Sequence, residues 1–142
     1  MTPNITTPTN QNITLTISGS DDGVGISALS GYSFDNGATR GKNTTTFSSN
    51  TTGTIKVRDA VGNISSTGFS ISNIDTTPPY ATNITYTPNT ATNGSINITL
   101  TISELVQDIV GWTMSGNATT WTKSYDNNIE TTIDFYDLAG NA

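Results

Sequence analysis

Carboxylates carry most of the chemistry that this sequence could do. The 142 residues include 11 Asp and Glu but no His and no Cys. This composition excludes Cys nucleophiles, Ser-His-Asp relays, the usual zinc ligand sets and disulfides. Acid–base catalysis would need two carboxylates on one surface. Glu130, Asp134 and Asp137 are close in sequence, but strand alternation places Asp137 on the opposite face from the other two. We therefore expect no enzyme activity.

Two other groupings could do chemistry. Asp21 and Asp22 precede a glycine in a loop, where such a pair either binds an ion or is simply solvated. An intramolecular isopeptide crosslink needs a Lys, an Asn or Asp and a nearby carboxylic acid. Lys123, Asn141 and either Glu104 or Glu130 would supply these groups.

Two tryptophans, Trp112 and Trp121, are candidates for stacking on a sugar ring if they are exposed. We expect Trp112 to be buried in a β core and leave the position of Trp121 open. An exposed Trp121 beside a groove would favour a carbohydrate-binding module, and a buried Trp121 would count against it.

Neutral polar residues replace most of the charge that a soluble domain usually carries. Charged residues make up 11% of the chain, against about 25% in typical domains, whereas Thr, Asn and Ser number 29, 16 and 15. The net charge of −6 makes binding to nucleic acid unfavourable. No apolar run is long enough to span a membrane, and the first residues lack the basic and apolar segments of a signal peptide.

Apolar and hydroxylated residues alternate along the chain, which is the pattern of half-buried β-strands. Ile13, Leu15 and Ile17 alternate with Thr, and turn signals such as 35–37 and 139–141 separate such runs. The other alternating runs predict strands around 32–34, 55–57, 69–71, 84–86, 98–102, 112–114, 121–123 and 133–135. Short strands at this spacing indicate an all-β sandwich or barrel.

The sequence contains an internal repeat. Residues 2–18 match 87–103 at 11 of 17 positions, and the segment 59–63 (Asp-Ala-Val-Gly-Asn) matches 137–141 (Asp-Leu-Ala-Gly-Asn). Between the copies lies a stiff connector, residues 73–80, with two consecutive prolines. We therefore predict two domains, 1–74 and 75–142.

Each copy lacks a strand that the other has. The strand expected at 81–86 has no counterpart before residue 2, and the one expected at 67–72 has none after residue 142. Either the chain is a window cut from a longer array of repeats, or neighbouring chains supply the missing strands, as in donor-strand pairing.

Three segments together resemble bacterial immunoglobulin-like repeats, which form tandem stalks in large surface adhesins. They are residues 32–37 (Tyr-Ser-Phe-Asp-Asn-Gly), 57–63 (Val-Arg-Asp-Ala-Val-Gly-Asn) and the connector 75–79 (Asp-Thr-Thr-Pro-Pro). The resemblance covers nearly the whole chain. It implies two tandem immunoglobulin-like β-sandwiches, with copy one lacking a first strand and copy two a last strand, and a position outside the cell or on its surface.

The resemblance also implies a calcium site. Related repeats often hold Ca²⁺ at the joint between domains, through the linker aspartate and the aspartate of the Asp-x-x-Gly-Asn turn. Here these are Asp75 and Asp59, with Asp137 serving the next joint. The alternative interpretation is turn chemistry, in which Asp59 and Asp137 bond to nearby backbone amides and glycine permits a positive φ.

The function we expect is therefore that of a non-catalytic stalk or adhesion fragment of a bacterial surface or secreted protein. Its partners would be neighbouring repeats and a host-cell or glycan receptor. One alternative is a carbohydrate-binding accessory module of a secreted enzyme, with Trp121 as ligand residue. Another is a phage or pilus-like subunit that assembles through its missing strands.

Overall fold

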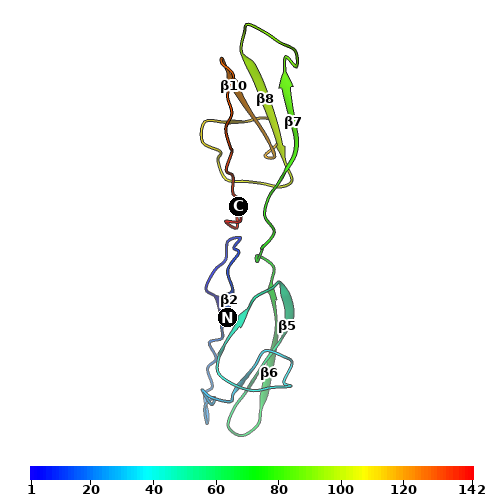
Figure 1. Cartoon of the computed structure of the whole chain (residues 1–142). Coiled ribbons are helices and arrows are strands. Elements are labelled where there is room, and N and C mark those ends of the chain that lie inside the picture. Colours follow the sequence, from blue (N-terminus) through cyan, green and yellow to red (C-terminus); the bar gives the residue numbers. More distant parts are fainter. The chain divides into compact units, whose positions relative to one another are not determined.

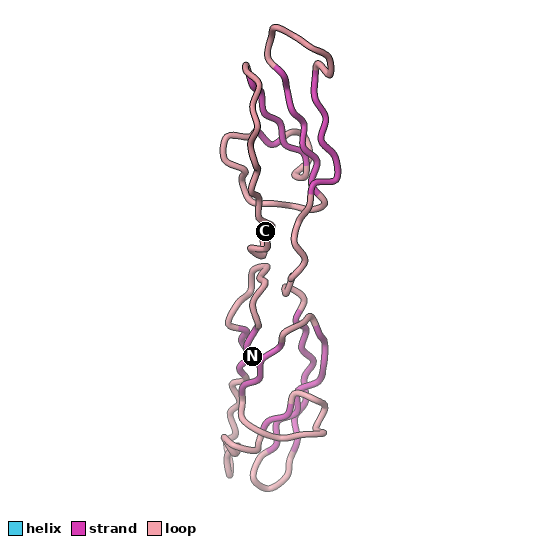
Figure 2. The backbone as a smooth tube through the Cα atoms, in the orientation of Figure 1, coloured by secondary structure: helices cyan, strands magenta, loops and turns pink.

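The alternation of aliphatic and hydroxylated residues decides which side of each strand is buried. In β2 (Ile13–Thr16), Ile13 and Leu15 are 0% and 1% exposed, whereas Thr14 and Thr16 remain partly exposed. The computed structural model describes all 142 residues. It is all-β, with ten strands in three antiparallel sheets and no helix (Figures 1 and 2).

The strands differ in length: β1 is among the shortest, and β5 and β6, which form a hairpin, are the longest. They are β1 (Thr2–Pro3), β2 (Ile13–Thr16), β3 (Tyr32–Ser33), β4 (Thr44–Phe47), β5 (Thr51–Arg58), β6 (Ile64–Ile71), β7 (Ala81–Thr87), β8 (Ile96–Ile102), β9 (Thr113–Met114) and β10 (Thr120–Tyr125). The structure contains no helix that could cross a membrane.

The chain divides into two compact units, Met1–Asp75 and Thr76–Ala142. This division lies one residue after the boundary placed from the sequence. The first unit has two three-stranded sheets, with strand orders β1-β2-β4 and β3-β5-β6. Its core draws on both sheets, as in a β-sandwich. The buried apolar residues are Ile13, Leu15, Ile17, Tyr32, Ile55, Phe69, Ile71 and Ile74.

The second unit has one four-stranded sheet, of order β7-β8-β10-β9. Its buried apolar cluster is smaller and consists of Leu100, Ile102, Val106, Ile109 and Trp121. The strand expected around Ile133 and Phe135 does not form: residues 128–136 belong to no strand. In the first unit the matching segment is β5, which pairs along its whole length with β6. No residues in the second unit correspond to β6.

Candidate functional site

The segment 59–63 of the first unit is a turn organised around the Asp59 carboxylate. Its Oδ1 accepts hydrogen bonds from the backbone N–H groups of Val61 (3.0 Å) and Asn63 (2.8 Å), and its Oδ2 accepts one from the Asn63 side chain at 2.7 Å. The Asp59 N–H donates to the Asn63 carbonyl at 3.1 Å, and Gly62 has φ = 102°. This turn connects β5 to β6.

The segment 137–141 of the second unit repeats this geometry. The Asn141 N–H donates to Asp137 Oδ1 at 2.8 Å and the Asn141 side chain donates to Oδ2 at 2.7 Å, the same distances as in the first unit. The Asp137 N–H donates to the Asn141 carbonyl at 3.0 Å, and Gly140 has φ = 92°. The two copies of the sequence pattern therefore form the same local structure.

Both aspartates are held as carboxylates. Desolvation by burial raises the pKa of Asp59 and of Asp137, but hydrogen bonds to each carboxylate outweigh it and the pKa of each lies below its ordinary value. The donors are the Asn side chain and the backbone amides of the turn. Only Asp137 is sequestered from solvent, with a side chain 1% exposed. The hydrogen bonds that both carboxylates accept are therefore those of a turn in which the first aspartate bonds to nearby backbone amides.

The first unit does not bring Asp59 and Asp75 together, contrary to the ligand set expected at the joint. β5 and β6 form one hairpin in which Arg58 pairs with Ile64 at one end and Thr51 with Ile71 at the other. Asp59 lies in the turn, whereas Asp75 follows the open end, where its N–H donates to the Thr9 carbonyl. The whole length of the hairpin, at about 3.3 Å per paired residue, therefore lies between the two carboxylates. One ion cannot bind both side chains, since its ligands lie only about 2.3–2.6 Å from it.

The second unit instead places Glu104 beside Asp137. One carboxylate oxygen from each lies within 4.8 Å of the other. The sheet produces this proximity, since β8 ends at Ile102 and Val106 then forms a bridge with Asp137. From sequence alone, Glu104 is a candidate only for a crosslink. The matching residue of the first unit is Gly19, so the Asp59 turn has no equivalent acidic neighbour at that position.

The connector reaches the same end of the second unit. Tyr80 is fixed to Ser103, because the Tyr80 N–H donates to Ser103 Oγ (3.1 Å) and the Ser103 N–H donates to the Tyr80 carbonyl (2.9 Å). Ser103 directly precedes Glu104.

The buried tryptophan of the second unit is Trp121 and not Trp112. Trp121, in β10, is 2% exposed and pairs with Leu100, whereas Trp112 is only partly buried against the core. The expectation that Trp112 is the buried tryptophan is therefore wrong. Trp121 cannot stack on a sugar in this structure, so the observation that would favour a carbohydrate-binding module is not met.

The other candidate groups take part in local interactions. Asp21 Oδ2 accepts from the N–H groups of Gly23 (3.2 Å) and Gly25 (2.7 Å), as in an ordinary loop. Lys123 Nζ lies over the Tyr125 ring, 5.1 Å from its centre, and the Asn141 amide is engaged by Asp137. These positions do not assemble the crosslinking trio.

Comparison with known proteins does not identify a function for this site. No protein-family model, curated protein or solved structure matches the chain. The chemistry of the site therefore follows from its own residues.

Proposed function

We propose that this chain is a non-catalytic stalk or spacer fragment of a bacterial surface or secreted protein, built from two repeat units. The observation that carries the proposal is the repeated turn. The same hydrogen bonds to the carboxylate and within the turn backbone recur in the two units, with closely similar distances. A repeated unit with its own core adds length without requiring a new fold.

The surface composition supports a structural role. Thr14 and Thr16 lie on the more exposed face of β2, and every residue of β7 is exposed, its Thr and Asn side chains together with Ile84 and Tyr86. Uncharged polar side chains keep such strands compatible with water, while they offer few groups for acid–base chemistry. The sequence resemblance to adhesin stalks points in the same direction.

Independent units predict a mechanical result. When the full chain is pulled from its two ends, we expect two unfolding events, one for Met1–Asp75 and a slightly shorter one for Thr76–Ala142. Each unfolded residue releases at most about 3.6 Å of chain, so the two events differ in length. Asp59→Ala should weaken the longer event and Asp137→Ala the shorter one. A single event that releases the whole chain, or variants that weaken both events equally, would contradict the proposal of separate repeats.

We further propose that Glu104 and Asp137 bind Ca²⁺ at the base of the second unit. Ca²⁺ takes six to eight oxygen ligands, which carboxylates, loop carbonyls and water supply. Two carboxylates within 4.8 Å repel each other, and a divalent cation relieves that repulsion.

The calcium proposal is tested by thermal unfolding with a chelator and with excess Ca²⁺. At a free ion concentration of 100 Kd, binding to the folded state stabilises it by about 2.7 kcal/mol, which is about 10 °C or more for a unit of this size. Glu104→Gln should abolish the shift. Asp108→Asn is the matched control, because it removes one exposed carboxylate of the same unit elsewhere. A shift that Asp108→Asn reduces as much as Glu104→Gln would indicate a general charge effect.

A further inference from the structure

The chain contains two Asn-Gly dipeptides, Asn36-Gly37 in the first unit and Asn93-Gly94 in the second, and both asparagines are exposed. Such a dipeptide is reactive, because glycine has no Cβ to keep its backbone nitrogen away from the carboxamide carbon of the preceding side chain. Attack by that nitrogen needs a free N–H group and a backbone that can move toward the carboxamide. The two dipeptides differ in both respects.

The first dipeptide is held in a closed turn. The Gly37 N–H donates to Ser33 Oγ at 2.8 Å, and Ser33 is 2% exposed. Ser33 Oγ in turn donates to Asp35 Oδ1 at 2.7 Å, so the acceptor is itself fixed. The Asn36 N–H donates to the Thr54 carbonyl at 3.0 Å, which joins the turn to β5. The backbone N–H groups of both residues of the dipeptide are therefore bonded in place.

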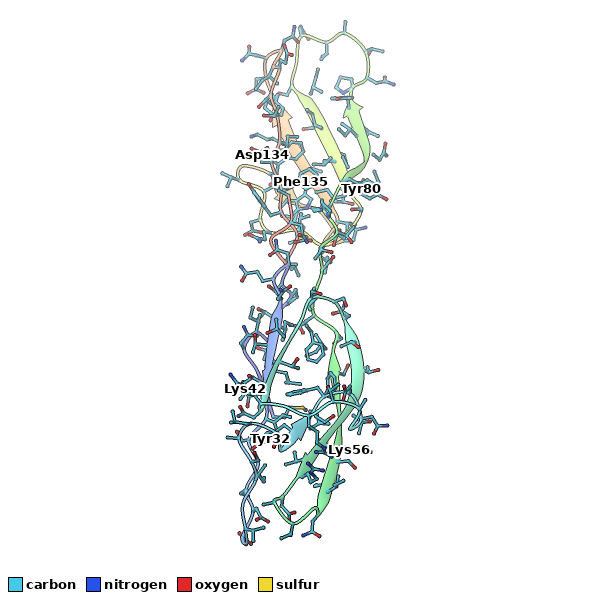
Figure 3. The ribbon with its side chains drawn as sticks, turned by 60° about the horizontal axis from the view of Figure 1, so that its bottom comes forward. Tyr32, Lys42, Lys56, Tyr80, Asp134 and Phe135 are labelled. Atoms are coloured by element: carbon cyan, nitrogen blue, oxygen red, sulfur yellow. The ribbon has the colours of Figure 1, made fainter.

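A side chain also covers this glycine. A Cβ built on Gly37 would lie 3.2 Å from Lys56 Cδ. Lys56 lies on β5 opposite Ser33 of β3, and Figure 3 labels it together with Tyr32 of β3. The stem of Lys56 therefore limits the movement that would carry the Gly37 nitrogen toward the Asn36 carboxamide.

The second dipeptide lies in an open loop. Every residue from 80 to 95 is exposed, and residues 88–95, which connect β7 to β8, belong to no strand. The Gly94 N–H donates to Thr92 Oγ1 at 3.0 Å, and Thr92 is exposed. Apart from the chain neighbours of Gly94, this oxygen is also the one atom within 4 Å of a Cβ built there. Water can replace such a bond, so little holds the Gly94 nitrogen in place.

We propose that Asn93 is a site of spontaneous succinimide formation in the folded chain, and that the turn around Ser33 protects Asn36 from the same reaction. The Gly94 nitrogen loses its proton to a solvent base and bonds to Asn93 Cγ. The bond from Cγ to its NH2 group breaks, and that group takes up a proton and leaves as ammonia. One water molecule then opens the ring. Cleavage between the nitrogen and Cγ gives Asp, and cleavage between the nitrogen and the main-chain carbonyl carbon gives isoaspartate.

The product differs from the asparagine in charge and in backbone length. Either product adds a carboxylate to the loop between β7 and β8, and isoaspartate also adds one carbon to the main chain. The exposed loop can absorb that carbon. In the first unit, with φ = 58° at Asn36 and 93° at Gly37, it would displace the Gly37 N–H from Ser33. This modification site goes beyond the stalk role and does not depend on calcium.

The test incubates the full chain in mildly alkaline buffer, once folded and once in urea, and follows deamidation by tryptic peptide mapping. Trypsin places the two dipeptides in separate peptides, 1–40 and 59–123. In urea, Asn36 and Asn93 should react at similar rates, because neither is held. In the folded chain, Asn93 should react more than about tenfold faster than Asn36, since each hydrogen bond shifts an opening equilibrium by up to about tenfold.

A pair of variants tests the protecting contact. Ser33→Ala removes the acceptor of the Gly37 N–H and should speed the reaction of Asn36 while leaving that of Asn93 unchanged. Asn43→Ala is the matched control, because it removes a side-chain hydrogen bond of the same unit elsewhere, the one to the Ile17 carbonyl at 3.0 Å. It should speed Asn36 less than Ser33→Ala does.

Three results would overturn the proposal. They are similar rates at the two asparagines in the folded wild-type chain, a faster reaction at Asn36 than at Asn93, and no reaction of Asn93 in the folded chain over the time in which it reacts in urea. With both variants shown to be folded by circular dichroism, an equal effect of Ser33→Ala and Asn43→Ala on Asn36 would overturn the protecting role of Ser33.

Discussion

Ile55 and Ile133 occupy matching positions in the two units, and replacing each with Ala measures how complete each core is. Ile55 is 0% exposed and Ile133 is partly buried. The substitution removes three carbons, each contributing about 0.8 kcal/mol when fully buried, and a closed cavity adds about 1 kcal/mol. We therefore expect Ile55→Ala to lower the free energy of unfolding of its unit by about 3.5 kcal/mol. Ile133→Ala should lower that of the second unit by about 1 kcal/mol, because its site is half open and leaves no closed cavity.

The two units can be followed separately in one urea titration. Both tryptophans, Trp112 and Trp121, lie in the second unit, so Trp fluorescence reports its unfolding alone. Far-UV circular dichroism follows both units, and linear extrapolation gives the free energy of each transition. Val110→Ala is the negative control, because its side chain is 94% exposed and its loss should change stability by less than about 0.5 kcal/mol.

Leu15→Ala and Leu100→Ala serve as the matched pair for this comparison. Both side chains are 1% exposed, and both should cost about 3–5 kcal/mol in their own units. If Ile133→Ala lowers the free energy of unfolding as much as Ile55→Ala does, while the two Leu substitutions behave alike, the second core is as complete as the first. That result would refute the reasoning that partial burial of Ile133 reflects a less complete core.

Two further predictions concern the first unit. Gly31→Ala should destabilise it by about 2 kcal/mol or more, measured by circular dichroism with the Trp signal unchanged, because the new Cβ would lie 2.6 Å from the Ser27 carbonyl oxygen. Gly41→Ala, at a position with nothing within 4 Å, should have little effect. Hydrogen bonds from the Thr39 side chain and N–H lower the pKa of Asp35 from 3.8 to about 2. The stability this gives is present above pH 3.8 and lost as pH falls towards 2, so Asp35→Asn should flatten acid denaturation in that range.

Side-chain alternation was sufficient to predict most of the strands, because it records which face of a strand is buried. β2, β8 and β10 form where Ile, Leu and Trp alternate with Thr. The same pattern at Ile133 and Phe135 does not form a strand. Alternation indicates that a segment could pair, but a strand also needs a neighbour along its length, and residues 128–136 make a backbone bond to another segment only at Tyr136, whose carbonyl accepts from the Gln107 N–H.

The candidate site was predicted in part. The Asp-x-x-Gly-Asn turn could be predicted locally, since its donors lie within four residues of the carboxylate and its glycine adopts a positive φ. The pairing of Asp59 with Asp75 was wrong, because a hairpin places its turn and its open end far apart. Glu104 was a candidate only for a crosslink and was not predicted to lie beside Asp137, because the two are distant in sequence and only the sheet brings them together.

Two turns with the same internal bonds therefore need not have the same function. The carboxylate of Asp59 is bonded by its own turn, and the position that would bring it an acidic neighbour is Gly19. Asp137 has the same bonds from its turn, but Glu104 occupies the matching position and adds a second negative charge within 4.8 Å. Each turn is bonded within its own unit, and under the calcium proposal the residue at position 19 or 104 decides whether a cation binds as well. Cation binding should therefore follow Glu104 rather than the repeated turn.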